Sequence, residues 1–155
     1  MQYPTRESDV TFAKALIAMA KSKSISMNMT KLQKLLYIAY GVMLASGQGR
    51  LLKGRAHAWP YGPVFPRIRE ELLGVNFDRV GENREDPELP PEVRSLFEAV
   101  LDKFGGFSAS SLSNWSHKEE SPWWRVISLE QCAWNTVIPD EYIEMYFKEN
   151  ILKSV

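Results

Sequence analysis

The feature that most constrains the fold is the segment of residues 30–46, in which apolar side chains cover most of the circumference of a helix. At about 100° per residue, one apolar stripe is formed by Leu32, Leu35, Leu36, Ala39, Val42 and Met43. A second apolar face carries Tyr37, Tyr40 and Leu44, which leaves a narrow sector for Lys31, Lys34 and Gly41. Thr30 is expected to cap this helix and Gly47 to end it. A helix this apolar is predicted to be central, or to offer one face to a partner.

The remaining chain shows helical periodicity and no useful segment that alternates with period two, so the predicted fold class is mainly α. Helices are expected at about residues 8–22, 30–46, 91–104, 108–115 and 123–127, and from residue 140 onward. These segments predict a compact fold of about six helices in a single domain, residues 1–155, with a core at about 8–150. Residues 74–90 lack periodicity and contain Gly81, Asn83 and Pro87, which predicts an exposed loop.

Residues 49–66 interrupt the helical pattern. They contain the helix-breaking residues Gly54, Pro60, Gly62, Pro63 and Pro66. We therefore expect turns and a short extended or two-stranded element near residues 52–60, with a strand around 55–59. Gly62-Pro63 is expected to open a short helix that runs to about Leu73. The aromatic–proline pair Trp59-Pro60 also permits a cis peptide bond.

The composition bounds the class of protein. The chain has 155 residues, of which 45% are hydrophobic and 25% charged, which suits one globular domain. Its single cysteine, Cys132, cannot close an intramolecular disulfide, so nothing points to an oxidising compartment. Glu7 and Asp9 precede any apolar run, which argues against a secretory signal, and no apolar run reaches the roughly 20 residues that span a bilayer. A cytoplasmic protein with no membrane partner is expected.

The charges are sorted along the chain although the net charge is zero. Residues 1–75 hold 11 Lys and Arg against 4 Asp and Glu, a balance of +7, whereas residues 76–155 hold 8 against 15, a balance of −7. Residues 10–69 contain ten basic residues and no acid. This asymmetry fits an anionic partner, either nucleic acid or an acidic protein surface. It fits equally well a basic half that folds against the acidic half, so that the two fields cancel.

Residues for catalysis or metal binding are scarce. The chain has only His57, His117 and Cys132 as thiol or imidazole groups, and no HExxH, CxxC or phosphate-binding glycine motif. The acids Glu82, Glu85, Asp86 and Glu88 lack EF-hand spacing and are predicted to be a solvated charge run. A Ser113 or Ser116 pair with His117 lacks the sequence of a nucleophile elbow. The sequence therefore predicts no enzyme, no catalytic residue, no metal site and no cofactor.

The most unusual segment is residues 55–66, in which three prolines alternate with Trp59, Tyr61 and Phe65. Prolines restrict the backbone, so these aromatic side chains are presented with little additional ordering entropy, as an interface anchor requires. Trp, Tyr and Arg are also common at binding hot spots. Two alternatives stay open: the aromatic rings fill the core under a rigid loop, or they stack on bases of single-stranded nucleic acid beside basic residues.

Several blocks of sequence resemble the Panacea domain family, which includes phage-associated proteins and SocA-like antitoxins. They are Thr30-Lys-Leu-Gln-Lys-Leu-Leu-Tyr37 with Ala39-Tyr40-Gly41, then Ala58-Trp59-Pro-Tyr61-Gly62-Pro63-Val64-Phe-Pro66, and later His117-Lys-Glu with Trp123-Trp124. The family's Thr-His pair is Ser116-His117 here, a departure that keeps a hydroxyl group. The resemblance covers about residues 10–147. It implies an antitoxin of a toxin–antitoxin system that neutralises a cognate toxin by direct protein contact. It also implies that the toxin is encoded by an adjacent gene.

The resemblance also suggests which residues form the site. A surface groove or its immediate support is expected from Tyr37, Tyr40, Trp59, Tyr61, Pro63, Val64 and His117. A basic surface that assists encounter is expected from Lys31, Lys34, Arg55 and Arg67. Leu32, Leu35, Leu36 and Trp123 are assigned mainly to the core. The alternative function is an RNA- or DNA-binding regulator that uses the basic N-terminal half.

Overall fold

The computed structural model describes residues 2–81 and 89–152. Its α-helices are α1 (Arg6–Ser22), α2 (Met29–Ala45), α3 (Pro66–Leu72), α4 (Pro91–Phe104), α5 (Ala109–Ser116), α6 (Pro122–Trp124) and α7 (Asp140–Asn150). A 3-10 turn, η1 (Phe77–Arg79), follows α3, and a π turn, η2 (Arg125–Leu129), continues α6. Two short strands, β1 (His57–Trp59) and β2 (Gly62–Val64), form the only sheet in the described residues. The mainly α fold class is confirmed.

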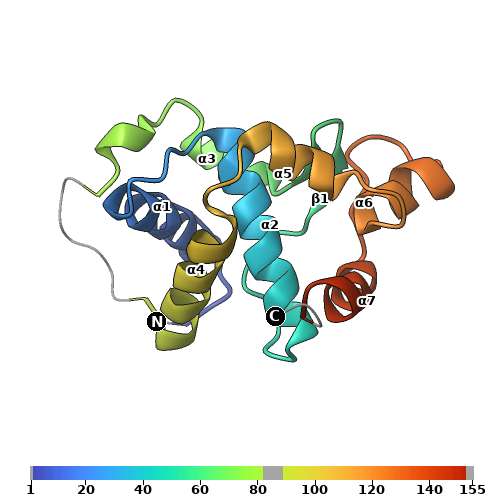
Figure 1. The fold of residues 1–155 in the computed structure, drawn as a ribbon, viewed down its shortest axis with the longest axis horizontal. Coiled ribbons are helices and arrows are strands. Elements are labelled where there is room, and N and C mark those ends of the chain that lie inside the picture. The colour runs from blue at the N-terminus through green and yellow to red at the C-terminus, as the bar shows by residue number, and fades with distance from the viewer. Residues whose placement is uncertain (1, 82–88, 153–155) are drawn as a thin grey trace.

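Helix α2 lies at the centre of the molecule. Figure 1 shows it between α1 and α4 on one side and α5, α6 and α7 on the other. Residues 31–41 are all buried, because both apolar faces of the helix meet neighbours. At Gly41, an added Cβ would lie 2.5 Å from the ring of Phe147 on α7, so the missing side chain lets these two helices approach closely. The predicted central position of this helix is confirmed.

Two helices begin earlier than their sequences suggest. Helix α1 is capped by Thr5, whose side chain accepts from Ser8 N while Ser8 Oγ accepts from Thr5 N. Ser8, near the expected start of this helix, is therefore its third residue and the second partner of the capping box. Helix α2 is capped by Asn28, whose Oδ1 accepts from Lys31 N at 2.9 Å, rather than by Thr30. In both cases an upstream side chain with the same capping chemistry satisfies the free amides.

The segment after α2 folds into an antiparallel hairpin. Trp59 pairs with Gly62 and His57 with Val64, so Pro60 and Tyr61 form the turn. On its other edge, β1 bonds the chain before α7: Ala58 N donates to Thr136 O at 2.8 Å and Ile138 N donates to Ala56 O at 2.8 Å. A helix opening at Pro63 is wrong, because Pro63 belongs to β2 and α3 starts at Pro66. The Trp59–Pro60 bond is trans, since the cis bond among the described residues is Tyr3–Pro4.

The second half of the chain follows its predicted signals closely. Pro91 opens α4, Ser108 caps α5, and Ser121 caps α6 ahead of Pro122. Residues 74–81 are exposed or half-buried, whereas the acids of the predicted charge run, from Glu82 to Glu88, lie outside the described residues. Within the described part of the chain, no helix combines the length and the apolar character needed to cross a membrane.

Candidate functional site

Two side chains of α2 hold the main chain of the hairpin from beneath. Lys34 Nζ donates to Pro63 O at 3.0 Å. Gln33 makes a reciprocal pair with Phe65: its Oε1 accepts from Phe65 N at 2.8 Å and its Nε2 donates to Phe65 O at 3.4 Å. These bonds satisfy buried backbone groups that no neighbouring strand reaches. Gln33 and Lys34 therefore fix the strand that leads into α3.

Side chains from the other side hold the turn. Ser113 Oγ donates to Tyr61 O at 2.6 Å, and Trp123 Nε1 donates to Trp59 O at 2.7 Å. The ring of His117 lies beside the backbone of Pro60. Together with Gln33 and Lys34, these residues restrain successive hairpin carbonyls while leaving the side chain of Tyr61 free.

Gly62 is required where the hairpin meets α2 and α5. It adopts a φ of +112°, and an added Cβ would lie 2.4 Å from Ser116 Oγ and 2.7 Å from Lys34 Cε. A side chain is thus excluded both by the backbone conformation and by space. The glycine in the Tyr61-Gly62-Pro63 sequence is explained by this close approach.

Lys31 and Lys34 do not form the expected basic surface. Their exposed fractions are 7% and 1%, because the hairpin and α5 cover the polar sector of α2. Burial lowers the pKa of Lys34 to about 8. Burial also lowers the pKa of His117, and the nearby Lys34 adds to this decrease while the backbone of Pro60 opposes it. Arg55 is exposed and Arg67 half-buried, so these two remain accessible.

Tyr37 and Tyr40 are part of the core. Tyr37 packs edge-on against Phe147, with ring centroids 5.5 Å apart, and Tyr40 donates to Asp140 Oδ1 at 2.6 Å. Burial raises the pKa of both phenols, with the Asp140 bond adding to the effect at Tyr40. Pro63 and Val64 are also buried. Of the residues expected at a groove, these four are buried, whereas Trp59, Tyr61 and His117 reach the surface.

An exposed aromatic ridge remains above this support, formed by Trp59, Tyr61, Trp123 and Trp134. Tyr61 is 71% exposed and Trp134 is 55% exposed, whereas Trp59 and Trp123 are half-buried. The rings of Trp123 and Trp134 lie 6.2 Å apart, and Arg69 stacks over Trp59 at 5.4 Å. Sequence reasoning missed Trp134. The signal that was available is its position beside Asn135, in an aperiodic stretch that offers no helix face to bury an indole.

A polar hollow adjoins the ridge, and we call it the arginine notch. It has a volume of about 340 Å³ and lies between β1 and the start of α3. Its lining residues are Asp9, Gly54, Arg55, His57, Phe65, Pro66, Arg67, Ile68, Glu70 and Asn135. Asn135 connects the two features, because its Oδ1 accepts from Trp59 Nε1 at 2.9 Å. Both predicted basic residues that stay accessible are thus brought together here.

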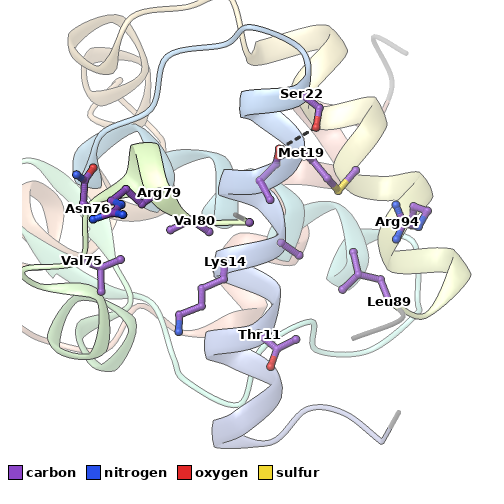
Figure 2. Close-up of a pocket in the computed structure, with 13 residues that line it drawn as sticks. Thr11, Lys14, Met19, Ser22, Val75, Asn76, Arg79, Val80, Leu89 and Arg94 are labelled. Atoms are coloured by element: carbon purple, nitrogen blue, oxygen red, sulfur yellow. Dashed lines mark hydrogen bonds between the residues drawn. The ribbon is translucent and has the colours of Figure 1, made fainter. Parts of the chain in front are cut away.

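A larger groove of about 650 Å³ runs along α1 (Figure 2). Its floor is apolar, with Ala15, Ala18 and Met19 from α1, and Lys14, Arg79 and Arg94 stand around it. Gly81 and Leu89 also line it.

The geometry at His117 does not assemble a reactive pair. Ser116 Oγ donates to Ser113 O at 2.7 Å, and Ser113 Oγ donates to Tyr61 O, so both hydroxyl protons are directed at backbone carbonyls. The ring of His117 instead packs against Trp123 with centroids 4.2 Å apart, and its Nε2 is buried without a hydrogen-bond partner among the described residues. In the same part of the chain, no group of three or more His, Cys, Asp or Glu side chains is arranged to hold a metal ion.

Comparison with known proteins shows the family to which this chain belongs. The chain belongs to the antitoxin SocA-like, Panacea domain family, whose sequence model matches residues 32–124, from α2 through α6. Antitoxin SocA of Caulobacter vibrioides (strain NA1000 / CB15N) is 30% identical over 124 residues, which cover 72% of this chain and 65% of that relative. The match thus spans less than two thirds of the relative's length. No solved structure matches the chain.

Proposed function

We propose that this protein is a cytoplasmic antitoxin that neutralises a cognate toxin by direct contact through the aromatic ridge. The observation that carries the proposal is the restrained hairpin: side chains of α2, α5 and α6 hold its carbonyls, while Tyr61 at its tip is 71% exposed. A rigid, exposed aromatic residue loses little entropy on binding and is a common hot-spot anchor. Membership in an antitoxin family supports the same function.

The same geometry favours a binding role over catalysis. In this proposal His117 is a positioning residue, because its ring lies beside Pro60 and packs against Trp123 beneath the turn. The nucleic-acid alternative is weakened, since Lys31 and Lys34 are buried and cannot meet phosphates. We therefore expect the partner to be a protein, encoded by a gene next to that of this chain.

Co-expression tests this function directly. The protein encoded by the adjacent gene should arrest growth alone, and this chain should restore growth and co-purify with it. Tyr61→Ala should abolish rescue while the variant keeps its circular dichroism spectrum, because Tyr61 is exposed and its backbone bonds remain. Phe107→Ala is the matched control, since Phe107 is 51% exposed and lies outside the ridge. Full rescue by Tyr61→Ala, Trp134→Ala and the double variant would exclude the ridge as the contact surface.

A further inference from the structure

We infer that the toxin surface seated on the aromatic ridge carries an acidic side chain that enters the arginine notch, between Arg55 and Arg67. This inference rests on the proposed function and adds the chemistry of the partner. The notch and the ridge share residues: Asn135 accepts from Trp59 Nε1 through its side chain and bonds His57 Nδ1 through its carbonyl at 2.9 Å. His57 and Asn135 both line the notch. A partner that covers Trp59 therefore also covers the notch.

The carboxylates of this region are already occupied. Asp9 is 1% exposed, and its two oxygens accept from Lys53 N at 2.8 Å and Gly54 N at 2.9 Å. Asp140 accepts from Tyr40 and is shared by Arg50 at 3.6 Å and Arg55 at 3.3 Å. These two carboxylates thus serve the backbone, a phenol and two arginines.

Arg67, unlike Arg55, has no direct ion pair in the described residues. Its attraction to Asp9 lowers the pKa of that carboxyl, against the dominant effect of burial, which raises it. Within the described part of the chain, however, no carboxylate lies within ion-pair distance of Arg67. Glu70 on the rim is exposed and remains hydrated. The notch is therefore lined by two basic and two acidic residues, and Arg67 is its guanidinium group without a direct ion pair in the described part of the chain.

Docking of a partner makes an unpaired Arg67 costly. A protein seated on the ridge excludes water from the half-buried Arg67, and a desolvated cation is tolerated only when it gains a counter-charge. A guanidinium group binds a carboxylate through two parallel N–H bonds, so an Asp or Glu side chain is the group that fits. A volume of about 340 Å³ has room for such a side chain. The same contact adds specificity, because partners without the acid would leave Arg67 unpaired.

A phosphate from nucleic acid is the other source of negative charge, and the surroundings disfavour it. A nucleic acid brings one charge per nucleotide along a continuous backbone. Here that backbone would pass Glu70, and the lysines of α2 that would follow it are buried. A single carboxylate on an otherwise apolar protein surface matches the notch and the ridge together.

The notch can be tested on the isolated protein. Sodium acetate, as a carboxylate probe, should shift the NMR signals of the Arg67 and Arg55 side-chain N–H groups and the Trp59 indole saturably, relative to sodium chloride at equal ionic strength. Arg67→Gln should remove the shifts at Arg55 and Trp59. Arg94, an arginine of the groove along α1, serves as the internal control. Equal shifts at Arg94, or none at Arg67, would overturn the inference, and a response to inorganic phosphate alone would do the same.

The second test uses the toxin identified by co-expression. Arg67→Gln and Arg67→Glu should weaken binding by roughly tenfold or more, whereas Arg94→Glu should not change it. Replacing one acid of the toxin with lysine should restore binding to Arg67→Glu. If Tyr61→Ala abolishes binding and the Arg67 variants do not, the notch is excluded and the proposed function stands. If neither Tyr61→Ala nor the Arg67 variants weaken binding, the ridge is excluded as the contact surface. Binding of oligo-uridylate that Arg67→Glu removes would assign the notch to nucleic acid instead.

Discussion

Lys34 is a buried amine whose bond to Pro63 O is the contact that holds it under the hairpin. Its folded pKa of about 8 lies below the unfolded value of 10.5. The unfolded chain therefore binds more protons between these values, and stability should rise with pH across that window. Relative to Lys34→Met, the free energy of unfolding of the wild type should increase by about 2 kcal/mol from pH 7 to pH 9.5.

Urea unfolding at several pH values measures this difference. Methionine keeps the length of the side chain, so the comparison isolates the titrating amine from the packing of its methylene groups. Lys53→Met is the control for the loss of a lysine side chain, because Lys53 is exposed. Parallel pH profiles for the wild type and Lys34→Met would show that Lys34 is not desolvated in solution.

The burial of Lys34 was beyond sequence reasoning. Lysine is ordinarily exposed, and the helix wheel placed Lys34 in the one polar sector of its helix. The hairpin covers the amine, and the carbonyl of Pro63, 29 residues later in the chain, replaces water as its hydrogen-bond acceptor. The sequence does predict an apolar helix face with Tyr37 and Tyr40, but it does not decide whether that face meets a partner or the core. The contacts that place it in the core come from Phe147 and Asp140, about a hundred residues away.

At the scale of elements, Gln33 should control the order of the hairpin. Gln33→Leu keeps the volume but removes the acceptor for Phe65 N and the donor to Phe65 O. Loss of a buried hydrogen bond costs about 1–3 kcal/mol when a polar group is left unpaired. Amide exchange at Phe65 should therefore accelerate by roughly tenfold or more, whereas amides in α1 and α4 should keep their protection.

Hydrogen exchange followed by NMR gives both readouts from one sample. Gln48→Leu is the matched control, since Gln48 is exposed and its side chain bonds only Ser46 among the described residues. Uniform acceleration throughout the molecule would mean that Gln33 supports the whole fold and not the hairpin in particular.

The contact of α2 with α7 depends on Gly41. Gly41→Ala would place a Cβ 2.5 Å from the ring of Phe147, which is fully buried and cannot move aside freely. Overpacking of this kind costs about 1–3 kcal/mol, although alanine favours a helix more than glycine does. The melting temperature should fall, and Gly106→Ala should leave it nearly unchanged because nothing lies within 4 Å of an added Cβ there. Unchanged stability in Gly41→Ala would contradict the close approach of α7.

The sequence predicts helix starts well where a proline or a capping side chain at the start itself sets them. Pro91, Ser108 and Ser121 each mark the start of a helix as their types suggest. The hairpin was predicted only in part, because two prolines three residues apart, Pro63 and Pro66, are both acceptable in the first turn of a helix. The helix starts at Pro66 because Gln33 of α2 accepts a hydrogen bond from the backbone of Phe65, the preceding residue. That contact is tertiary and leaves no trace in the local sequence.

At the scale of the whole molecule, the basic half folds partly against the acidic half. Lys23 pairs with Asp102 at 3.2 Å, and Arg50 and Arg55 converge on Asp140, so the ion pairs of the first 75 residues reach across to the second half. With Lys31 and Lys34 buried as well, the charge asymmetry of the sequence does not become a continuous basic surface. Arg55 and Arg67 at the arginine notch stay accessible.

Asp140 should be the carboxylate on which this arrangement depends. Its side chain is 18% exposed, and it joins Tyr40 of α2, Arg50 and Arg55 to the first turn of α7. Asp140→Asn would leave two arginines around a neutral group; because Arg50 is 29% and Arg55 47% exposed, solvent screens the pairs and the cost should be about 1–2 kcal/mol. Urea unfolding should show most of that loss. Asp102→Asn, which breaks the exposed pair with Lys23, should cost under about 1 kcal/mol. Equal losses in the two variants would mean that Asp140 is solvated and that the halves are joined by apolar packing alone.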